Sequence, residues 1–211
     1  MKNKLLMYIQ KFGILKTFKM ALLKIISPVF YYQKEILFEK NINEGIRKIN
    51  PKIDVIIRKA TVKDAYLFEK DFSKSYKEDF LKRIRRDECF IALKDNNIAH
   101  IIWITYRDFF YRDVQTTLRV NKNESYIFDA STPLKFRGRG IYPAVIQYIL
   151  SHLKNKKIKK ALISTASDNY PSLKGILKNK FRKINTAVYI SVFNKLILKR
   201  DFEKKLKLYF N

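Results

Sequence analysis

Residues 125–150 read SYIFDASTPLKFRGRGIYPAVIQYIL, and this stretch decides the fold that we expect. An apolar strand is followed by a short basic loop containing Gly138 and Gly140, and then by a helix. Glycine lets the backbone approach a ligand closely. The first N–H groups of a helix have no intrahelical partner and lie at the positive end of its dipole. The stretch therefore predicts a binding site for an anionic, phosphate-bearing group.

Three basic residues, Lys135, Arg137 and Arg139, surround this turn in the sequence. Charge-assisted hydrogen bonds are roughly twice as strong as neutral ones, so these side chains would strengthen the same anion site. Two common nucleotide motifs do not fit. The turn lacks the Lys-Ser/Thr pair of a P-loop, and it lacks the third glycine and the acidic residue of a dinucleotide-binding fold. The alternative interpretation is a glycine turn that merely ends a strand.

The bulk composition allows a packed domain with an unusual charge. The chain has 211 residues, 47% of them hydrophobic and 14% aromatic, which suffices for one domain with an appendage. The 45 Lys and Arg residues exceed the 19 Asp and Glu residues, giving a formal net charge of +26. Such a charge favours an anionic partner: nucleic acid, an anionic membrane surface or an acidic carrier protein. The alternative is a compositional bias that raises lysine everywhere, since the lysines are scattered.

Cysteine, histidine and hydropathy exclude several classes. Cys89 is the single cysteine, so no disulfide can form within the chain, and a reducing compartment fits. Two histidines and one cysteine leave no cluster with zinc-site spacing, so we expect no metal. The most apolar stretch, 12–32, is interrupted by Lys16, Lys19 and Lys24, which argues against a spanning helix. No cleavable signal peptide is predicted, so we expect a cytoplasmic protein, peripheral to the inner membrane face if its N-terminus binds lipid.

Residues 1–50 differ from the rest, and we expect a basic, amphipathic helical extension there. Between Ile14 and Ile26 apolar residues recur at helical spacing, with lysines mostly on the other face. Such a helix could lie on an anionic membrane surface, or pack on the domain or on a second subunit of a homodimer. Pro28 ends or kinks it. Residues 51–200 form the main domain in this prediction, and residues 201–211 form a helical tail.

The main domain has a mixed α/β pattern. Asp95-Asn96-Asn97 joins two apolar strands and is a strong hairpin signal. Thr61 is placed to cap a helix, and so is Ser73 or Ser75. We expect strands at 54–58, 89–93, 98–106, 114–120, 125–132, 161–166 and 188–198, and helices at 62–72, 75–86, 143–153 and 172–179. This order predicts a mixed, mostly antiparallel central sheet of about six or seven strands flanked by helices.

The same order of elements resembles the GNAT superfamily of N-acetyltransferases, and three signatures support the resemblance. Residues 57–64, IRKATVKD, resemble the family's I-R-x-A-T-x-x-D opening. Residues 137–142, RGRGIY, resemble its acyl-CoA pyrophosphate motif, (Q/R)-x-x-G-x-(G/A). Asn169, Ser172 and Phe181 stand where an N-x-x-A…G-F segment is expected. The resemblance covers residues 53–198.

The resemblance implies an N-acyltransferase that uses acetyl-CoA or another acyl-CoA as co-substrate. It assigns the pyrophosphate to the turn, which comprises Leu134, Lys135, Arg137, Gly138, Arg139, Gly140, Ile141 and Tyr142. Asn169 and Ser172 are expected to contact the cofactor as well. In the family, backbone N–H groups of the fourth strand polarise the thioester carbonyl, which here implies residues 130–134.

The sequence departs from the family pattern at three positions. Tyr142 stands where the motif usually has Gly or Ala, so we expect a tighter or shifted cradle. Lys180 replaces the glycine before Phe181. Ile176 stands where many relatives carry the tyrosine that protonates the departing thiolate. We therefore take Tyr170 as the candidate acid, with an exposed loop tyrosine as the alternative.

Asp129 is the candidate general base, because it lies on the strand just before the turn. A carboxylate in a partly apolar cleft can have its pKa raised toward the working pH. The alternatives are that Asp129 pairs with a neighbouring Lys or Arg, or points to the other sheet face, since strand alternation separates it from Phe128 and Ala130. Glu88 and His100 are lesser candidates.

The sequence identifies the acceptor only as a small-molecule primary amine. We expect the segments 71–86 and 106–124 to bind it, and Phe109, Phe110 and Tyr111 either line its pocket or cover a sheet edge. The basic N-terminus favours an amino sugar or a lipid-linked envelope precursor. Two other functions stay open: transfer from acyl carrier protein, and nucleic-acid binding without catalysis. The second is disfavoured, because the charge is not gathered in one segment and no RNA-binding signature is present.

Overall fold

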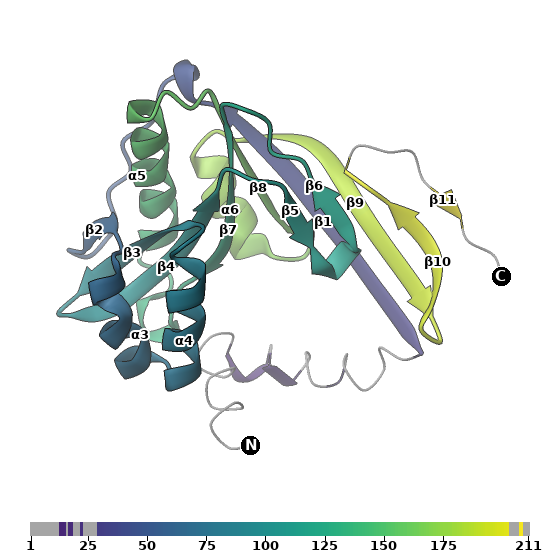
Figure 1. The fold of residues 1–211 in the computed structure, drawn as a ribbon, viewed down its shortest axis with the longest axis horizontal. Helices are drawn as coiled ribbons and strands as arrows, with labels where there is room; N and C mark the ends of the chain where they lie inside the picture. Colours follow the sequence, from purple (N-terminus) through teal and green to yellow (C-terminus); the bar gives the residue numbers. More distant parts are fainter. Residues whose placement is uncertain (1–12, 16, 19–21, 23–28, 203–206, 209–211) are drawn as a thin grey trace.

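A nine-stranded sheet organises the protein (Figure 1). The computed structural model describes residues 13–15, 17–18, 22, 29–202 and 207–208. The strand order is β11-β10-β9-β1-β8-β7-β4-β3-β2, and among neighbours only β7 and β8 are parallel. Strands β5 and β6 form a separate small hairpin sheet. The predicted mixed fold with a mostly antiparallel sheet is therefore confirmed.

Most predicted elements of the main domain are present, with shifted boundaries. The strands are β1 (Phe30–Asn41), β2 (Ile56–Lys59), β3 (Glu88–Lys94), β4 (Asn97–Thr105), β5 (Phe109–Tyr111), β6 (Thr116–Leu118), β7 (Glu124–Ser131), β8 (Lys160–Ala166), β9 (Arg182–Val192), β10 (Lys195–Arg200) and β11 (Lys207–Leu208). The helices are α3 (Ala65–Asp71), α4 (Lys74–Arg83), α5 (Ile141–Asn155) and α6 (Tyr170–Lys178), with 3-10 turns η1 (Ile42–Glu44), η2 (Val62–Asp64), η3 (Arg112–Val114) and η4 (Leu134–Phe136). The predicted hairpin turn between β3 and β4 is confirmed: Asp95 and Asn96 adopt φ of 50° and 56°, which Asp and Asn tolerate.

Helices cover both faces of the sheet (Figure 1). On one face, α5 and α6 bury the largest core cluster, in which Val145 and Ile149 pack with Phe90 and Ile163 of the strands. On the other face, α3 and α4 pack over β3 and β4, and the β5–β6 hairpin packs over β1, β7 and β8. Phe128 of β7 packs against the clusters under both the helices and the hairpin, so these share one face.

The Arg58 opening of the domain has a structural role. Arg58 on β2 makes two hydrogen bonds to Asp64, at 2.8 Å from Nη1 to Oδ2 and 2.5 Å from Nη2 to Oδ1. Asp64 also accepts from the backbone N–H of Thr61, at 2.7 Å, in a capping box that starts η2 and α3. The bond from Arg58 holds the pKa of Asp64 below its usual range, and this outweighs burial. The Arg58–Asp64 pair therefore joins β2 to η2 and α3.

Replacing Asp64 by Asn is expected to lower the free energy of unfolding by about 2–3 kcal/mol at pH 7, because Arg58 keeps its charge and loses its partner. The folded pKa of Asp64 is lowered, so its stabilisation exists above the unfolded value of about 3.9 and disappears as the pH falls through the folded value. Urea titrations should show a smaller difference in the free energy of unfolding between the wild type and the variant at pH 3 than at pH 7. Asp54→Asn, at an exposed site, is the matched control. Equal stability of the Asp64 variant and the wild type at pH 7 would contradict this role.

Strand β1 corrects the expected helical extension over residues 1–50. It lies between β8 and β9 and pairs with both, from Glu35↔Ala166 to Asn41↔Lys160 on one side and from Phe30↔Val192 to Glu39↔Arg182 on the other. The expected helix 14–26 falls partly outside the described residues, of which 14, 15, 17, 18 and 22 are helical. The helical pattern of the N-terminal segment therefore does not extend into β1. The expected domain boundary at residue 50 would separate β1 from the other strands of the same sheet.

The expected helical tail over 201–211 is also wrong where the structure describes it. Lys207 and Leu208 form β11, which pairs with Lys199 and Leu198 of β10. Phe202 is buried, and its ring lies 6.2 Å from that of Tyr111. Burial of Phe202 under the hairpin turns the chain back along β10, which favours strand pairing over a free helix.

Candidate functional site

The ladder between β7 and β8 stops before either strand ends, and we call the opening between their unpaired ends the cleft. Their parallel register runs from Glu124↔Lys160 to Ile127↔Ile163, yet β7 continues to Ser131 and β8 to Ala166. Within the described chain, the second halves of these neighbouring strands therefore diverge. Asp129 and Ala130 on the unpaired half of β7 are exposed.

A β-bulge on β7 shapes this cleft. Trp103 of β4 pairs with Phe128, whereas Ile101 pairs with Ser131, so Asp129 and Ala130 together stand opposite Ile102. Asp129 has a left-handed backbone, with φ of 47°. A bulge leaves an extra residue out of the ladder and re-aims its neighbours. The backbone at 129–131 is thereby turned toward the cleft, at the place where the sequence predicts carbonyl-polarising N–H groups.

The glycine turn closes one end of the cleft. It links β7 to α5, and Gly138 and Gly140 have φ of 73° and 74°, which explains why glycine is needed. Gly140 is the N-cap of α5 and has no side chain to cap it, so the backbone N–H groups of Ile141 and Tyr142 start the helix uncapped. The backbone N–H of Lys52 donates to the Arg139 carbonyl at 2.7 Å, which fixes the turn against the segment before β2.

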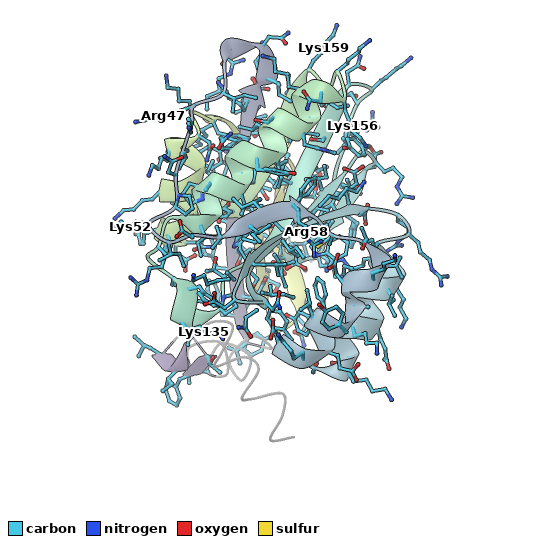
Figure 2. All side chains as sticks on the ribbon, turned by 90° about the vertical axis from the view of Figure 1, so that its left-hand side faces the viewer. Arg47, Lys52, Arg58, Lys135, Lys156 and Lys159 are labelled. Atoms are coloured by element: carbon cyan, nitrogen blue, oxygen red, sulfur yellow. The ribbon has the colours of Figure 1, made fainter. Side chains whose placement is uncertain are left out.

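The basic residues of the turn divide into two roles. Arg137 donates from Nε to the Thr132 carbonyl at 2.9 Å, so it braces the loop. Lys135, Arg139 and the neighbouring Lys52 form no ion pair with a described carboxylate. Figure 2 shows Lys52 and Lys135 along the same edge of the face that carries α5. These three side chains are available to an anion at the turn. Leu134, in the η4 turn before them, is 43% exposed.

The ring of Tyr142 points into the protein and does not cover the turn. It lies between α5 and α6, 5.4 Å from the His100 ring, and its hydroxyl is 3.2 Å from the Ser172 Oγ. A Cβ added at Gly175 would lie 2.4 Å from Tyr142 Cδ1. The tyrosine in place of Gly or Ala is therefore accommodated by a glycine on the facing helix. Ser172, expected at the cofactor, is hydrogen-bonded to Tyr142.

Gly175→Ala is expected to destabilise the protein by about 1–3 kcal/mol, because the new methyl group overlaps the Tyr142 ring. In a Tyr142→Ala background the sign should reverse, since the overlap is gone and alanine is about 1 kcal/mol better than glycine inside a helix. Urea denaturation of the four proteins measures this coupling. Equal effects of Gly175→Ala in both backgrounds would contradict the packing described for Tyr142. Lys178→Ala, exposed on the same helix, is the control.

Helix α6 places the remaining predicted residues. Asn169 is its N-cap, and Tyr170 is its first residue and 68% exposed, directly after β8. Ile176 is fully buried in the core, so a tyrosine there would not face the cleft without repacking. Lys180, in place of the expected glycine, has φ of 59°. The backbone of Lys180 therefore has a left-handed conformation, which glycine adopts more easily than other residues.

The predicted base, Asp129, is engaged by a cation. Arg83 of α4 contacts its Oδ2 at 2.7 Å, which matches the alternative of a pair with a neighbouring basic residue. Burial alone would raise the pKa of Glu88, but Lys156, Lys59 and His152 hydrogen-bond to it, outweigh burial and hold the pKa at about 2. Burial lowers the pKa of His100 to about 3, and its Nδ1 lies 2.7 Å from the Thr132 hydroxyl. Glu88 and His100 are therefore poorly suited to accept a proton near neutrality.

A cavity of about 230 Å³ opens between α4 and the bulge. Four of its nine lining residues are aromatic, and charged and hydroxyl groups come from α4 as well as from β7: Phe68, Tyr76, Asp79, Phe80, Arg83, Ile101, Trp103, Asp129 and Ser131. The Arg83 guanidinium lies 4.3 Å from the Trp103 ring centroid, in a cation–π contact. Sequence reasoning pointed to segment 71–86 but missed Trp103 and Ser131, whose strand positions gave no sign that they face a cavity. Phe109 and Tyr111 instead pack under the hairpin on Tyr126 and Phe202, and Phe110 is 54% exposed.

Neither a metal-binding cluster nor a membrane-spanning helix is present in residues 13–15, 17–18, 22, 29–202 and 207–208. No three His, Cys, Asp or Glu side chains of that part of the chain are grouped closely enough to hold a metal ion. Across the same residues, none of the helices has the length and apolar character needed to cross a membrane.

Comparison with known proteins identifies the fold. No family model matches the sequence, and no curated protein matches it. Among solved structures, a GCN5-related N-acetyltransferase from Sphaerobacter thermophilus is similar at a TM-score of 0.57 and 7% identity, over 88% of this chain and 58% of that one. A GNAT-family acetyltransferase from Colwellia psychrerythraea has a TM-score of 0.52 at 15% identity, over 77% and 56%. A tandem GNAT protein from the clavulanic acid biosynthesis pathway has a TM-score of 0.51 at 9% identity, over 84% and 59%.

The chain therefore has the fold of the GNAT superfamily. In its large sheet, β2, β3, β4, β7 and β8 are neighbours in the same order as along the chain, and only the β5–β6 hairpin, which forms a separate sheet, comes between β4 and β7. The chain spans less than two thirds of the length of each of these three structures. At such low identity the comparison establishes the fold, and the activity has to be argued from the site.

Proposed function

We propose that the protein transfers an acyl group from an acyl-CoA, with acetyl-CoA the simplest donor, to a primary amine. One observation carries the proposal: the unpaired end of β7 beyond Ile127 lines the cavity with Asp129 and Ser131, and the chain runs on from it through residues 132–136 to the uncapped glycine turn. A donor lying in the cleft would present its thioester to an acceptor in the cavity.

The donor half is supported by the turn. The pyrophosphate would accept hydrogen bonds from the backbone N–H groups of residues 138–142, at the positive end of α5. Lys52, Lys135 and Arg139 would neutralise the remaining phosphate charge. The pantetheine arm would follow the unpaired edge of β7, past Asn169 and Ser172 at the start of α6. The N–H groups near Ala130 would polarise the thioester carbonyl.

The acceptor half is supported by the cavity. Its aromatic walls would pack on a flat apolar face, and Asp79 and Asp129 would attract an ammonium group. Arg83 holds Asp129 in place and leaves its own remaining N–H groups for hydroxyl or carboxylate oxygens of the acceptor. A compact amine with one apolar face, such as an amino sugar or its lipid-linked precursor, fits this lining. We assign Asp129 to holding the amine, and Tyr170 to protonating the thiolate.

A product assay tests the proposal. Purified protein is incubated with acetyl-CoA and a panel of glucosamine, 2-phenylethylamine, lysine and spermidine, and acetylated amines are quantified by mass spectrometry. We expect product from the first two, because each has a ring that fits the aromatic walls, and loss of that product in Trp103→Ala. Failure to bind acetyl-CoA, or binding without any product, would overturn the proposal.

An acyl carrier protein is the second candidate donor. Arg47, Lys52, Lys135 and Lys159 lie on the face that carries α5 (Figure 2), and Lys52 is hydrogen-bonded through its backbone to the turn where the donor would enter. An acidic carrier protein would be attracted to such a face. Comparing acetyl-CoA with an acetylated carrier protein in the same assay distinguishes the two donors, and faster transfer from the carrier at equal concentration would favour it.

We also propose that the N-terminal segment lies on an anionic membrane surface, in a cytoplasmic protein. The side chains of Ile14, Leu15 and Phe18 are 74%, 86% and 70% exposed, which is costly in water unless something covers them. Cosedimentation with vesicles of anionic lipid measures this association, and equal recovery with neutral vesicles would contradict it.

A further inference from the structure

The inserted strand β1 brings a buried carboxylate, Glu35, beside the cleft. Glu35 pairs with Ala166 at the end of β8 and with Ala187 of β9, so small residues flank it on both sides. Its residue is 2% exposed. Oε1 accepts a 2.7 Å hydrogen bond from Gln33 Nε2, whereas Oε2 has no partner among the described residues. A buried carboxylate oxygen without a partner is costly, and such a group is rarely kept for stability.

The surroundings of Glu35 do not compensate its charge. The titratable and polar groups that face it come from several elements: Tyr31 and Gln33 of β1, Tyr111 of β5, Asp113 of η3, Tyr126 of β7, and Asp168 after β8. The two charged groups among these are carboxylates. Burial first, and then Asp113 and Asp168, raise the pKa of Glu35 to about 7, although hydrogen bonds from Gln33 and Tyr111 act in the other direction. Glu35 can therefore gain or lose a proton near neutral pH.

A row of hydroxyl groups leads from the cleft to Glu35. Ser164 is half-buried and follows Ile163, the last residue of β8 that pairs with β7, so it borders the cleft. The hydroxyl of the buried Tyr126 is 2.8 Å from the Ser164 Oγ and holds it in place. The Tyr111 hydroxyl lies close to both Ser164 and Glu35. Burial raises the pKa of Tyr111 well above the usual value, so it stays protonated and can pass a proton along a hydrogen-bonded row.

We propose that Glu35 is the terminal proton acceptor of the acyl transfer, reached from the cleft through the hydroxyl groups of Ser164 and Tyr111. The inference rests on the proposed function. An ammonium acceptor gives one proton through this row to the Glu35 carboxylate and becomes an amine. The amine nitrogen bonds to the thioester carbon, the carbon–sulfur bond breaks, and the second nitrogen proton passes to the thiolate through Tyr170. Glu35 then releases its proton to solvent.

Glu35 acts through other groups, so its test needs a readout that a structural role would not move. Glu35→Gln keeps the size of the side chain and an oxygen for the Gln33 bond. We expect the kcat of acetyl transfer to fall about 100-fold, with acetyl-CoA affinity unchanged. In the wild type, kcat should rise with pH through about 7, as Glu35 ionises. In the variant this rise should be absent.

The same variant should be more stable than the wild type at pH 8. The folded pKa of Glu35 lies above its unfolded value, so the stability it contributes is present below the unfolded pKa and is lost as the pH rises through about 7. Glutamine never ionises, so its thermal midpoint should exceed that of the wild type at pH 8 and approach it at pH 5. A Glu35→Gln variant with a lower kcat and a higher thermal midpoint at pH 8 would show that its activity is not lost through unfolding.

Glu39→Gln is the matched control on the same strand. Glu39 is buried too, but Arg182 and Lys160 contact it, so its loss should lower stability and leave the pH dependence of kcat intact. A second variant, Tyr111→Phe, should lower kcat and remove the rise near pH 7, because the broken row of hydroxyls no longer leads to Glu35. Retention of both the rate and the rise in Glu35→Gln would overturn the inference. Absence of acetyl-CoA binding by the wild type would show separately that the proposed function fails, and the inference would fall with it.

Discussion

Gly140→Asp is expected to weaken acetyl-CoA binding at least about 100-fold, equivalent to about 3 kcal/mol. The substitution places a carboxylate at the N-cap of α5, where the phosphates would bind, and like charges repel strongly at such short range. The new side chain fits, because the nearest atom to an added Cβ is the Pro51 Cα at 3.7 Å. Asp also tolerates the φ of 74° better than most residues. The loss should therefore appear in binding rather than in folding.

Calorimetric titration with acetyl-CoA measures this loss, and Gly45→Asp is its control. Gly45 has φ of 86° and ψ of 148°, which a side chain tolerates less well than the αL conformation of Gly140, and no atom lies within 4 Å of an added Cβ. The added charge is therefore the same and the backbone strain is no smaller. Gly45 follows η1, at the far end of β1 from the turn (Figure 1). Equal affinity of the Gly140 variant and the wild type would contradict a phosphate site at this turn.

Removal of residues 1–45 is expected to abolish cooperative folding. Strand β1 is a ladder partner of both β8 and β9, so its loss leaves one edge of each of these interior strands unpaired. It also removes Leu37, Phe38 and Ile42, all buried in the cores on the two faces of the sheet. Each such side chain contributes about 1.5–3 kcal/mol by burial. Their sum is comparable with the total stability of a typical domain, about 5–15 kcal/mol.

A chain that begins at residue 29 retains β1 and is the control for this truncation. Circular dichroism during urea titration should show one cooperative transition for the longer chain and none for the chain beginning at residue 46. A cooperative transition in the shorter chain would mean that β8 and β9 can close the sheet without β1.

Local signals in the sequence predicted the parts of the fold that local chemistry determines. The Asp95-Asn96 turn, the Arg58–Asp64 opening and the glycine turn each depend on residues close together in the chain. Their backbone angles and hydrogen bonds follow from the residue types. The conformation of the glycine turn, on which the proposed donor site depends, could therefore be predicted from the sequence.

Strand β1 could not be predicted in the same way. Its buried Glu39 and Lys40 are residue types that usually lie at the surface, and we expected their segment to be part of the helical extension over residues 1–50. Glu39 is buried only because Arg182 and Lys160, more than a hundred residues later, lie beside it. Partners at such separation leave no local pattern. The burial of Glu35 likewise depends on β8 and the hairpin, which are far from it in the sequence.

Two predicted features changed for reasons of packing. The bulge at Asp129 breaks strict strand alternation, so a face assignment made by counting residues from Phe128 does not hold there. Tyr142 was expected to crowd the turn, yet Gly175 on another helix leaves space for its ring. A sequence read one segment at a time does not reveal such compensation.

A crystal structure of the protein with coenzyme A bound tests the central claim most directly. We predict that pyrophosphate oxygens lie about 3 Å from backbone nitrogens of residues 138–142, with the thiol arm between the diverging ends of β7 and β8. The sulfur should end near Ala130, within reach of the aromatic cavity. Coenzyme A bound elsewhere, or a cleft that stays empty at saturating ligand, would contradict the assignment of this cleft as an acyl-CoA site.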